Sequence, residues 1–248
     1  LFILSFFLFS IVSCSLNKQI AKQAHKILLQ DTAIRQGQIG ICIYEPATGK
    51  YWYNHDAEKY FIPASNTKLF TLYGGLKYLG DSLNGFKIHE TRDSIYFKPN
   101  GDPTFLLAEF KDQLFLNYLK NSGKKISYGF NLNQKFKELG SGWAWDDYQS
   151  NYMAERSQMP VYGNVVTFVS NGKKIQSLPP LFLSTEYFNE PMMQLLGSND
   201  KFILSRKKAE NKFHFDKSNS IFTEQKIPFV SGDLPFIAIR ILEEALQI

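Results

Sequence analysis

Cysteine is scarce in this chain of 248 residues, which contains only Cys14 and Cys42. Two cysteines cannot form the multi-bridge framework that stabilises small secreted domains. Cys42 falls on a predicted strand, where a buried structural role is the usual one for a lone thiol. The four histidines are scattered, and none has a second ligand at helical spacing, so we do not expect a zinc site.

A concentrated basic stripe is also missing. The formal net charge is +5, but the lysines are dispersed along the chain. The short clusters at Lys173-Lys174 and 206–208 are typical of solvated loops. The sequence therefore does not predict nucleic acid as a partner.

The apolar run at the N-terminus, Leu1 to Val12, is too short to span a membrane as a helix. A short uncharged run before small residues is typical of the h-region of a secretory signal. Ile11-Val-Ser-Cys14 also resembles a bacterial lipobox, which predicts a lipoprotein signal peptide at 1–13, lipidation of Cys14 and a membrane anchor. The alternative is an ordinary cleaved signal with a chance cysteine. Because no basic n-region precedes the run, we expect the first residues of the natural chain to be missing.

One short motif carries the main chemical signal of the sequence. Ser65-Asn-Thr-Lys68 places a hydroxyl nucleophile and an amine base on one face of a helix. The same spacing starts at six serines: Ser15, Ser65, Ser122, Ser170, Ser198 and Ser205. Ser65 differs from the others in its surroundings, because Pro63 precedes it and leucines recur at helical spacing from Leu69 to Gly80. We therefore expect Ser65 to be the N-cap of a buried amphipathic helix. The alternative is that Ser65 is only a cap and Lys68 a solvated side chain.

The segments before Ser65 add structural context. Residues 17–35 have the apolar periodicity of an amphipathic helix. Residues 38–44 read as a strand, 45–49 as a turn, and 50–54 as a second strand. This order, leading into Phe61-Ile-Pro-Ala-Ser-Asn-Thr-Lys68, resembles the start of a penicillin-binding transpeptidase domain, in which Ser-x-x-Lys is the first signature motif.

Two later segments narrow the resemblance. Gly101-Asp-Pro-Thr104 is similar to an element of the low-molecular-mass D-alanyl-D-alanine carboxypeptidase/endopeptidases, although Asn100 stands where that family usually has glycine. Gly142-Trp-Ala-Trp-Asp-Asp-Tyr148 resembles their Gly-Trp-x-Trp-Asp-Asp region, whereas composition alone would place its tryptophans in a core. These proteins carry a large insertion after the Ser-x-x-Lys motif.

The resemblance implies an α+β fold: part of a penicillin-binding/β-lactamase-like α/β sandwich with an inserted, mostly β accessory domain. We expect the first part of the catalytic domain at 14–82, the insertion at 83–228, and the return to the catalytic domain at 229–248. Pro235 at the start of the periodic segment 236–246 predicts a helix there.

The resemblance also implies a function. Ser65 would be the nucleophile and Lys68 the base of a serine-type carboxypeptidase/endopeptidase that acts on peptidoglycan stem peptides through an acyl-enzyme. β-Lactams would acylate the same serine, no metal or organic cofactor would be needed, and the protein would lie in the bacterial periplasm or cell envelope. A non-catalytic peptidoglycan-binding relative and a β-lactamase or esterase on the same scaffold are the alternatives.

Two signature motifs of that family are missing. No Lys-Thr-Gly or Lys-Ser-Gly occurs, and Ser-x-Asn occurs only at Ser15 and at Ser82. Ser82 lies just past the end of the helix that follows Ser65, and that end is on the order of 20 Å from Ser65. We expect both motifs beyond Ile248, so that these residues form an N-terminal fragment that is inactive alone. Tyr162-Gly-Asn164 fits the Tyr-x-Asn motif of cephalosporinase-type β-lactamases, but its neighbours resemble the inserted domain.

Overall fold

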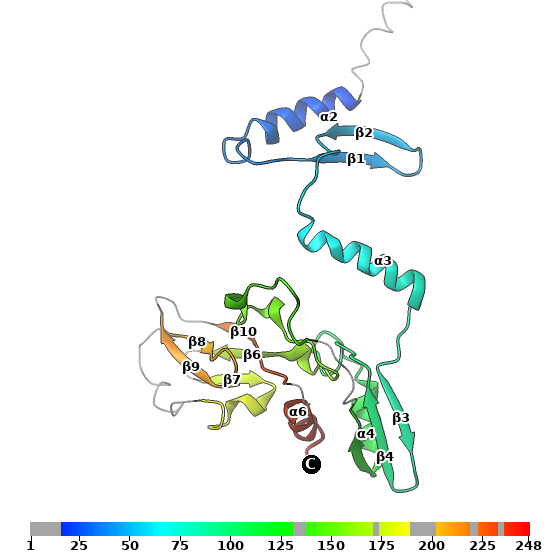
Figure 1. Cartoon of the computed structure of the whole chain (residues 1–248), viewed down its shortest axis with the longest axis vertical. Helices are drawn as coiled ribbons and strands as arrows, with labels where there is room; N and C mark the ends of the chain where they lie inside the picture. Colours follow the sequence, from blue (N-terminus) through cyan, green and yellow to red (C-terminus); the bar gives the residue numbers. More distant parts are fainter. Residues whose placement is uncertain (1–15, 131–136, 171–173, 189–201, 219–222, 233–235) are drawn as a thin grey trace, which may run out of the picture. The chain divides into compact units, whose positions relative to one another are not determined.

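The computed structural model describes residues 16–130, 137–170, 174–188, 202–218, 223–232 and 236–248 (Figure 1). The chain divides into two compact units, Leu1–Asp81 and Ser82–Ile248. Both combine helices with small sheets, which confirms the predicted α+β class. The proposed signal peptide and Cys14 lie outside the described residues. No helix in the described part of the chain has the length and apolar character needed to cross a bilayer.

The first unit contains the elements expected around the Ser-x-x-Lys motif. They are α2 (Leu16–Ala24) with a π-helical turn (His25–Leu29), β1 (Ile41–Glu45), β2 (Lys50–His55), a 3₁₀ turn (Ala64–Asn66) and α3 (Thr67–Leu79). The two strands pair antiparallel through a turn in which Gly49 has a φ of 68°. Gly80, with a φ of 83°, ends α3 as the sequence predicts. The hairpin and the helix after Ser65 are thus confirmed.

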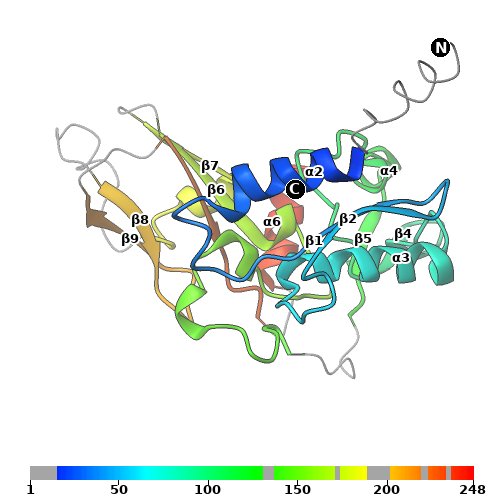
Figure 2. The same ribbon diagram turned by 90° about the horizontal axis from the view of Figure 1, so that it is seen from above.

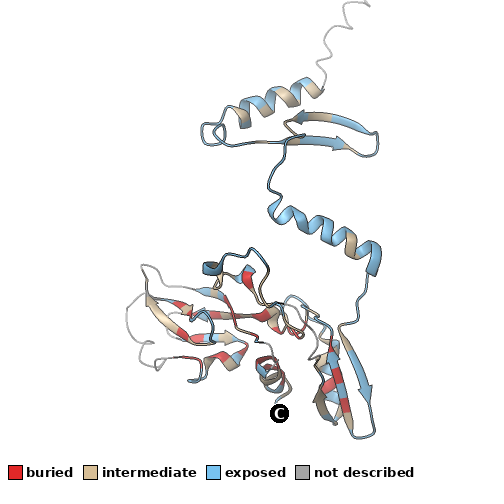
Figure 3. Cartoon of the chain, in the orientation of Figure 1, coloured by how far each residue is buried: buried red, intermediate tan, exposed pale blue. Residues whose placement is uncertain are grey.

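Two expectations about α3 are wrong. The helix has no buried residue, and Leu69, Leu72 and Leu76 are each more than half exposed (Figure 3). Periodicity identifies the face of a helix that is suited to burial, but it does not provide the surface that covers it. Ser65 is not the N-cap either, because it lies inside the 3₁₀ turn that precedes α3.

The first sheet of the second unit packs on a helix. Its strands are β3 (Phe86–Glu90), β4 (Ser94–Pro99) and β5 (Lys125–Tyr128), with α4 (Leu114–Ser122) between β4 and β5. β3 and β4 form an antiparallel pair, whereas β4 and β5 are parallel, so α4 serves as their crossover. The ring of Phe115 on α4 stacks on Phe86 with the centroids 3.9 Å apart and meets Phe97 edge-on. These aromatic contacts fix the helix against the sheet.

The remaining strands surround an aromatic core. They are β6 (Val165–Ser170), β7 (Ile175–Leu178), β8 (Phe202–Arg206), β9 (Phe213–Lys217) and β10 (Glu224–Pro228), followed by α6 (Phe236–Leu246). β6 lies between β10 and β7 (Figure 1), while β8 and β9 form a separate antiparallel pair (Figure 2). Four phenylalanines in this region have no exposed surface: Phe168, Phe182, Phe213 and Phe229. The predicted helix at 236–246 is confirmed, and it contributes Ile241 to the same core.

Candidate active site

The described structure brings the two predicted catalytic side chains into contact. Ser65 belongs to the 3₁₀ turn and Lys68 to the first turn of α3, and Lys68 Nζ lies 3.0 Å from Ser65 Oγ. Both residues are exposed. A hydrogen bond stabilises the turn that carries Ser65, since the hydroxyl of Thr67 donates to the backbone carbonyl of Ala64 over 3.0 Å. A nucleophile and a base in direct contact are the minimum arrangement for covalent acyl transfer.

The residue before the nucleophile has an unusual backbone. Ala64 has a φ of 44°, in the left-handed region that residues with a Cβ rarely adopt. Such conformations cost on the order of 1–3 kcal/mol and cluster at functional sites. No sequence signal predicted this feature, because alanine is not a residue that favours positive φ.

The other serine-x-x-lysine pairs in the described residues do not form this contact. Ser122 Oγ donates to the carbonyl of Leu119 over 2.8 Å instead of approaching Lys125. Lys208 lies 4.6 Å from the Trp145 ring centroid, whereas Ser205 bonds to residues of the neighbouring strand. The local surroundings, and not the spacing, therefore distinguish Ser65.

Ser205 also belongs to a cluster with the composition of a catalytic triad but a different geometry. His214 Nε2 lies 2.7 Å from Ser205 Oγ, and that hydroxyl also donates to Asp216. In a triad the carboxylate accepts from Nδ1 on the far side of the imidazole. Here Nδ1 of His214 is buried without a partner in the described residues, and Asp216 lies 3.6 Å from Nε2. The cluster consequently lacks the orienting bond that a triad requires.

The Gly-Asp-Pro-Thr element forms a self-supporting turn. Asp102 Oδ1 accepts from the backbone and the hydroxyl of Thr104, over 2.9 and 2.7 Å. Gly101 has a φ of 78° and donates its N–H to the carbonyl of Gln158. This contact links the turn to the segment that follows the tryptophan motif.

The tryptophan motif lies near the surface of the second unit. Trp143 is 40% exposed and Trp145 is 71% exposed, so the core position suggested by composition is wrong. Tyr148, at the end of the motif, donates its hydroxyl to the carbonyl of Arg206 over 3.0 Å. Arg206 itself is only 3% exposed, so its prediction as part of a solvated loop is also wrong. Strand pairing and the contact with Tyr148 bury it, and neither is visible in a local charge pattern.

Tyr162-Gly-Asn164 has a structural role in the second unit. The side chain of Asn164 is buried, and its Nδ2 donates to the carbonyl of Glu155 and to the hydroxyl of Ser157. Its Oδ1 accepts from the N–H of Val161 over 3.3 Å. These bonds occupy both ends of the amide, which argues against its use as the second motif of a β-lactamase.

The described residues contain no cluster of three histidine, cysteine or acidic side chains that could hold a metal ion. Cys42 is exposed on β1, so the expectation of a buried thiol is wrong. The strand pairs on one edge only, and the described residues of the first unit leave this position exposed.

The sequence profile of the D-Ala-D-Ala carboxypeptidase 3 (S13) family matches residues 20–212. The chain belongs to this family. A D-alanyl-D-alanine carboxypeptidase of Actinomadura sp. is 34% identical over 97 residues, which are 35% of this chain and 18% of that protein. The crystal structure of penicillin binding protein 4 from Haemophilus influenzae aligns with a TM-score of 0.53 and 15% identity. The alignment with that structure covers 84% of this chain and 50% of the Haemophilus chain. The chain therefore spans at most half the length of these two relatives. This likeness confirms the penicillin-binding type of fold.

Proposed function

We propose that this chain carries the nucleophile and the base of a serine-type D-alanyl-D-alanine carboxypeptidase/endopeptidase. The contact of 3.0 Å between Lys68 Nζ and Ser65 Oγ is the observation that carries the proposal. Membership of the S13 family supports it, since the curated relative is a D-alanyl-D-alanine carboxypeptidase. The proposed substrates are peptidoglycan stem peptides in the bacterial cell envelope.

The proposed reaction begins with Lys68 in its neutral amine form, which accepts the proton of the Ser65 hydroxyl. Ser65 Oγ then attacks the carbonyl carbon between the two terminal D-alanines. The C–N bond breaks, and the leaving nitrogen takes the proton from Lys68. D-Alanine departs, and the rest of the peptide remains bound to Ser65 as an ester. Water hydrolyses that ester, and the serine regains its proton. A β-lactam would follow the first half of this sequence, because opening of its ring amide forms the same kind of ester.

The lipid anchor is proposed separately, on the sequence Ile11-Val-Ser-Cys14. Metabolic labelling with a radioactive fatty acid tests it in the producing cell. Label should be incorporated into the wild-type protein and be absent from Cys14→Ser. Equal labelling of both would exclude Cys14 as the acceptor.

A fluorescent penicillin tests the chemistry in the full-length gene product. The wild-type protein should form a covalent adduct that survives denaturation, and Ser65→Ala should form none. Ser122→Ala is the matched control, because Ser122 has the same spacing to a lysine but bonds to the backbone. Unchanged labelling of Ser65→Ala would exclude Ser65 as the nucleophile.

Product analysis then separates the alternatives. Release of D-alanine from a pentapeptide, faster than hydrolysis of the β-lactam, identifies a peptidase. Cleavage of cross-linked dimers of stem peptides identifies an endopeptidase, and rapid β-lactam turnover identifies a β-lactamase. Saturable binding of peptidoglycan without a covalent adduct would identify a non-catalytic relative and contradict the proposal.

A further inference from the structure

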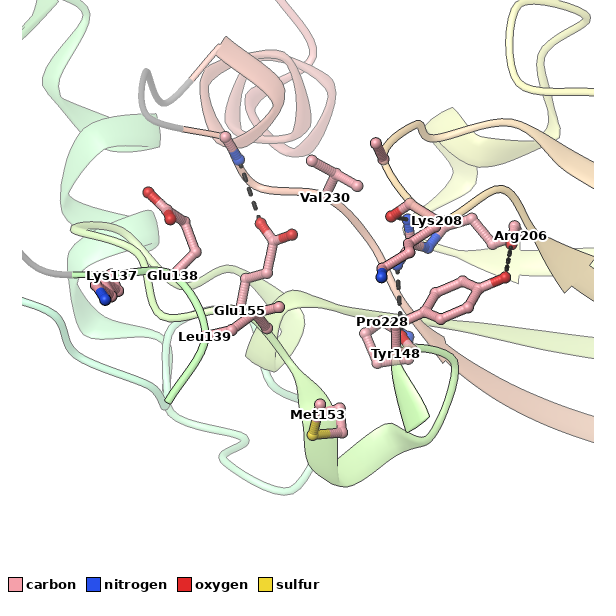
Figure 4. Close-up of a pocket in the computed structure, with 12 residues that line it drawn as sticks. Lys137, Glu138, Leu139, Tyr148, Met153, Glu155, Arg206, Lys208, Pro228 and Val230 are labelled. Atoms are coloured by element: carbon pink, nitrogen blue, oxygen red, sulfur yellow. Dashed lines mark hydrogen bonds between the residues drawn. The ribbon is translucent and has the colours of Figure 1, made fainter. Parts of the chain in front are cut away.

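A cavity of about 540 Å³ lies within the second unit, and neither Ser65 nor Lys68 lines it. Its wall is formed by residues from the stretches 137–139, 148–155, 206–209 and 228–232 (Figure 4). The stretches come from the end of the tryptophan motif and the segments on both sides of it, from the end of β8 and the loop after it, and from the end of β10 and the segment after it. The cavity is therefore a product of the tertiary fold of this unit.

One side of the cavity is cationic. Arg206 is 3% exposed, and its guanidinium donates to the carbonyls of Lys207, Lys208, Glu210 and Tyr148. Its Nε is buried without a hydrogen-bond partner in the described residues. Burial lowers the pKa of Arg206, because a buried guanidinium is less well solvated than an exposed one. The buried guanidinium therefore contributes positive potential to this side of the cavity without offering its Nε to a ligand.

Lys208 adds a second cation to this side. Its ammonium lies 4.6 Å from the centroid of the Trp145 ring, and no carboxylate in the described residues forms an ion pair with it. The side chain of Lys208 is exposed and lines the cavity, so its ammonium is accessible to a ligand there.

Glu155 supplies the opposite charge. Its Oε2 accepts from the N–H and the hydroxyl of Ser231 over 2.7 and 3.0 Å, and from the N–H of Gly232 over 3.4 Å. These bonds fix the carboxylate, whereas Oε1 has no hydrogen-bond partner in the described residues, and the charge of Glu155 interacts with that of Arg206. In the view of Figure 4, Glu155 lies between Glu138 on one side and Lys208 with Arg206 on the other. Lys137 and Glu138 also line the cavity, and their formal charges are opposite.

We propose that this cavity binds a small zwitterion, an amino acid or a short peptide with free ends. The ligand carboxylate would lie against Lys208, on the side where the buried charge of Arg206 adds positive potential, and the ligand ammonium would lie against Oε1 of Glu155. Charge-assisted hydrogen bonds of this kind are the stronger ones in proteins. The carboxylate of Glu155 and the guanidinium of Arg206 are held in place by their own hydrogen bonds before a ligand arrives, which reduces the ordering cost of binding. The inference goes beyond the proposed peptidase activity and does not depend on it.

The experiment follows the indole N–H signal of Trp145 by NMR, because this ring lies beneath Lys208. Trp145→Phe identifies the signal. D-Alanyl-D-alanine is titrated into the full chain carrying Ser65→Ala, which removes the proposed nucleophile. We expect a saturable shift. N-acetyl-D-alanyl-D-alanine lacks the ammonium and D-alanyl-D-alaninamide lacks the carboxylate, and each should bind about ten-fold more weakly or worse.

Two variants test the residues. Lys208→Gln should raise the Kd for the dipeptide about ten-fold, while Lys207→Gln, whose side chain does not line the cavity, should leave it within about two-fold. Glu155→Gln should weaken the dipeptide but not the acetylated analogue, and its amide oxygen can still accept from Ser231. The proposal is overturned by the absence of a saturable shift, by equal affinities of the three probes, or by equal effects of the two lysine variants. Failure of the peptidase proposal would appear instead as the absence of a penicillin adduct on Ser65 in the wild-type protein. Lys208→Gln, with Ser65 intact, should form this adduct as the wild-type protein does.

Discussion

The two units of the chain differ most in what they bury. Residues 16–81, the described part of the first unit, contain no buried side chain, although α3 carries a row of leucines. The second unit holds every buried hydrophobic residue of the described chain, with Phe168, Phe182, Phe213 and Phe229 at its centre. Yet the predicted nucleophile and base lie in the first unit.

This difference in burial shows that the contact between two catalytic side chains and the formation of a hydrophobic core depend on different parts of the chain. The contact between Ser65 and Lys68 needs only the 3₁₀ turn and one turn of helix, so a short segment of chain is sufficient to form it. A rigid hydrophobic core needs residues from many elements, as in the second unit, where β6, β9, β10 and α6 contribute. Chemistry can therefore be encoded in a segment that does not provide its own core.

The largest expected effect concerns the base. Lys68→Ala should lower the rate of acylation by a fluorescent penicillin by about 10²–10⁴-fold, because a positioned general base typically contributes that much. The rate is measured in the full-length gene product by quenched-flow labelling. Lys125→Ala, from the pair with Ser122, should acylate at the wild-type rate. An unchanged rate for Lys68→Ala would contradict its assignment as the base.

The next prediction tests the difference in burial directly. Phe213→Ala removes a fully buried ring and should cost about 3–5 kcal/mol in the free energy of unfolding. Leu72→Ala, at a side chain that is 59% exposed, should cost about 0.5 kcal/mol or less. Urea denaturation followed by circular dichroism measures both. A cost of several kcal/mol for Leu72→Ala would show that α3 is covered in solution.

A smaller effect is expected at Asn164. Asn164→Ala leaves the carbonyl of Glu155 and the N–H of Val161 without their partner, and should cost about 1–3 kcal/mol. Asn100→Ala removes one exposed bond and should cost about 1 kcal/mol or less. Penicillin labelling per folded molecule should be unchanged in both. Loss of labelling in folded Asn164→Ala would favour the β-lactamase interpretation of Tyr162-Gly-Asn164.

The smallest effect is a pH dependence in the second unit. Hydrogen bonds from Lys124 and Tyr118 hold the pKa of Glu90 below its ordinary value of 4.5. A lowered folded-state pKa stabilises the protein above the unfolded value, and this contribution is lost as the pH falls through the folded value. Glu90→Gln should therefore reduce the loss of stability in acid, measured as the urea midpoint between pH 7 and pH 3. Glu109→Gln, at an exposed residue without an ion pair in the described chain, should follow the wild-type curve.

The sequence predicted the features that depend on neighbours along the chain. Gly49 and Gly80 marked a turn and a helix end, and both have positive φ because such positions favour a residue without a Cβ. The helix at 236–246 followed from its periodicity. Features that depend on distant residues were predicted poorly. The charge pattern predicts a solvated loop at Arg206, yet contacts with Tyr148 bury it, and composition alone would place Trp145 in a core although most of its surface is exposed.

The sequence by itself determined the candidate chemistry, because Pro63 and the periodic leucines after Ser65 place this serine and Lys68 at the start of a helix, where residues three apart lie on one face. It also determined the family through motifs between residues 20 and 212. Only the tertiary structure decided which apolar side chains are covered, how Asn164 is used, and that Arg206, Lys208 and Glu155 line one cavity. Burial and charge pairing are sums over elements far apart in the sequence, and the fold alone brings those elements together.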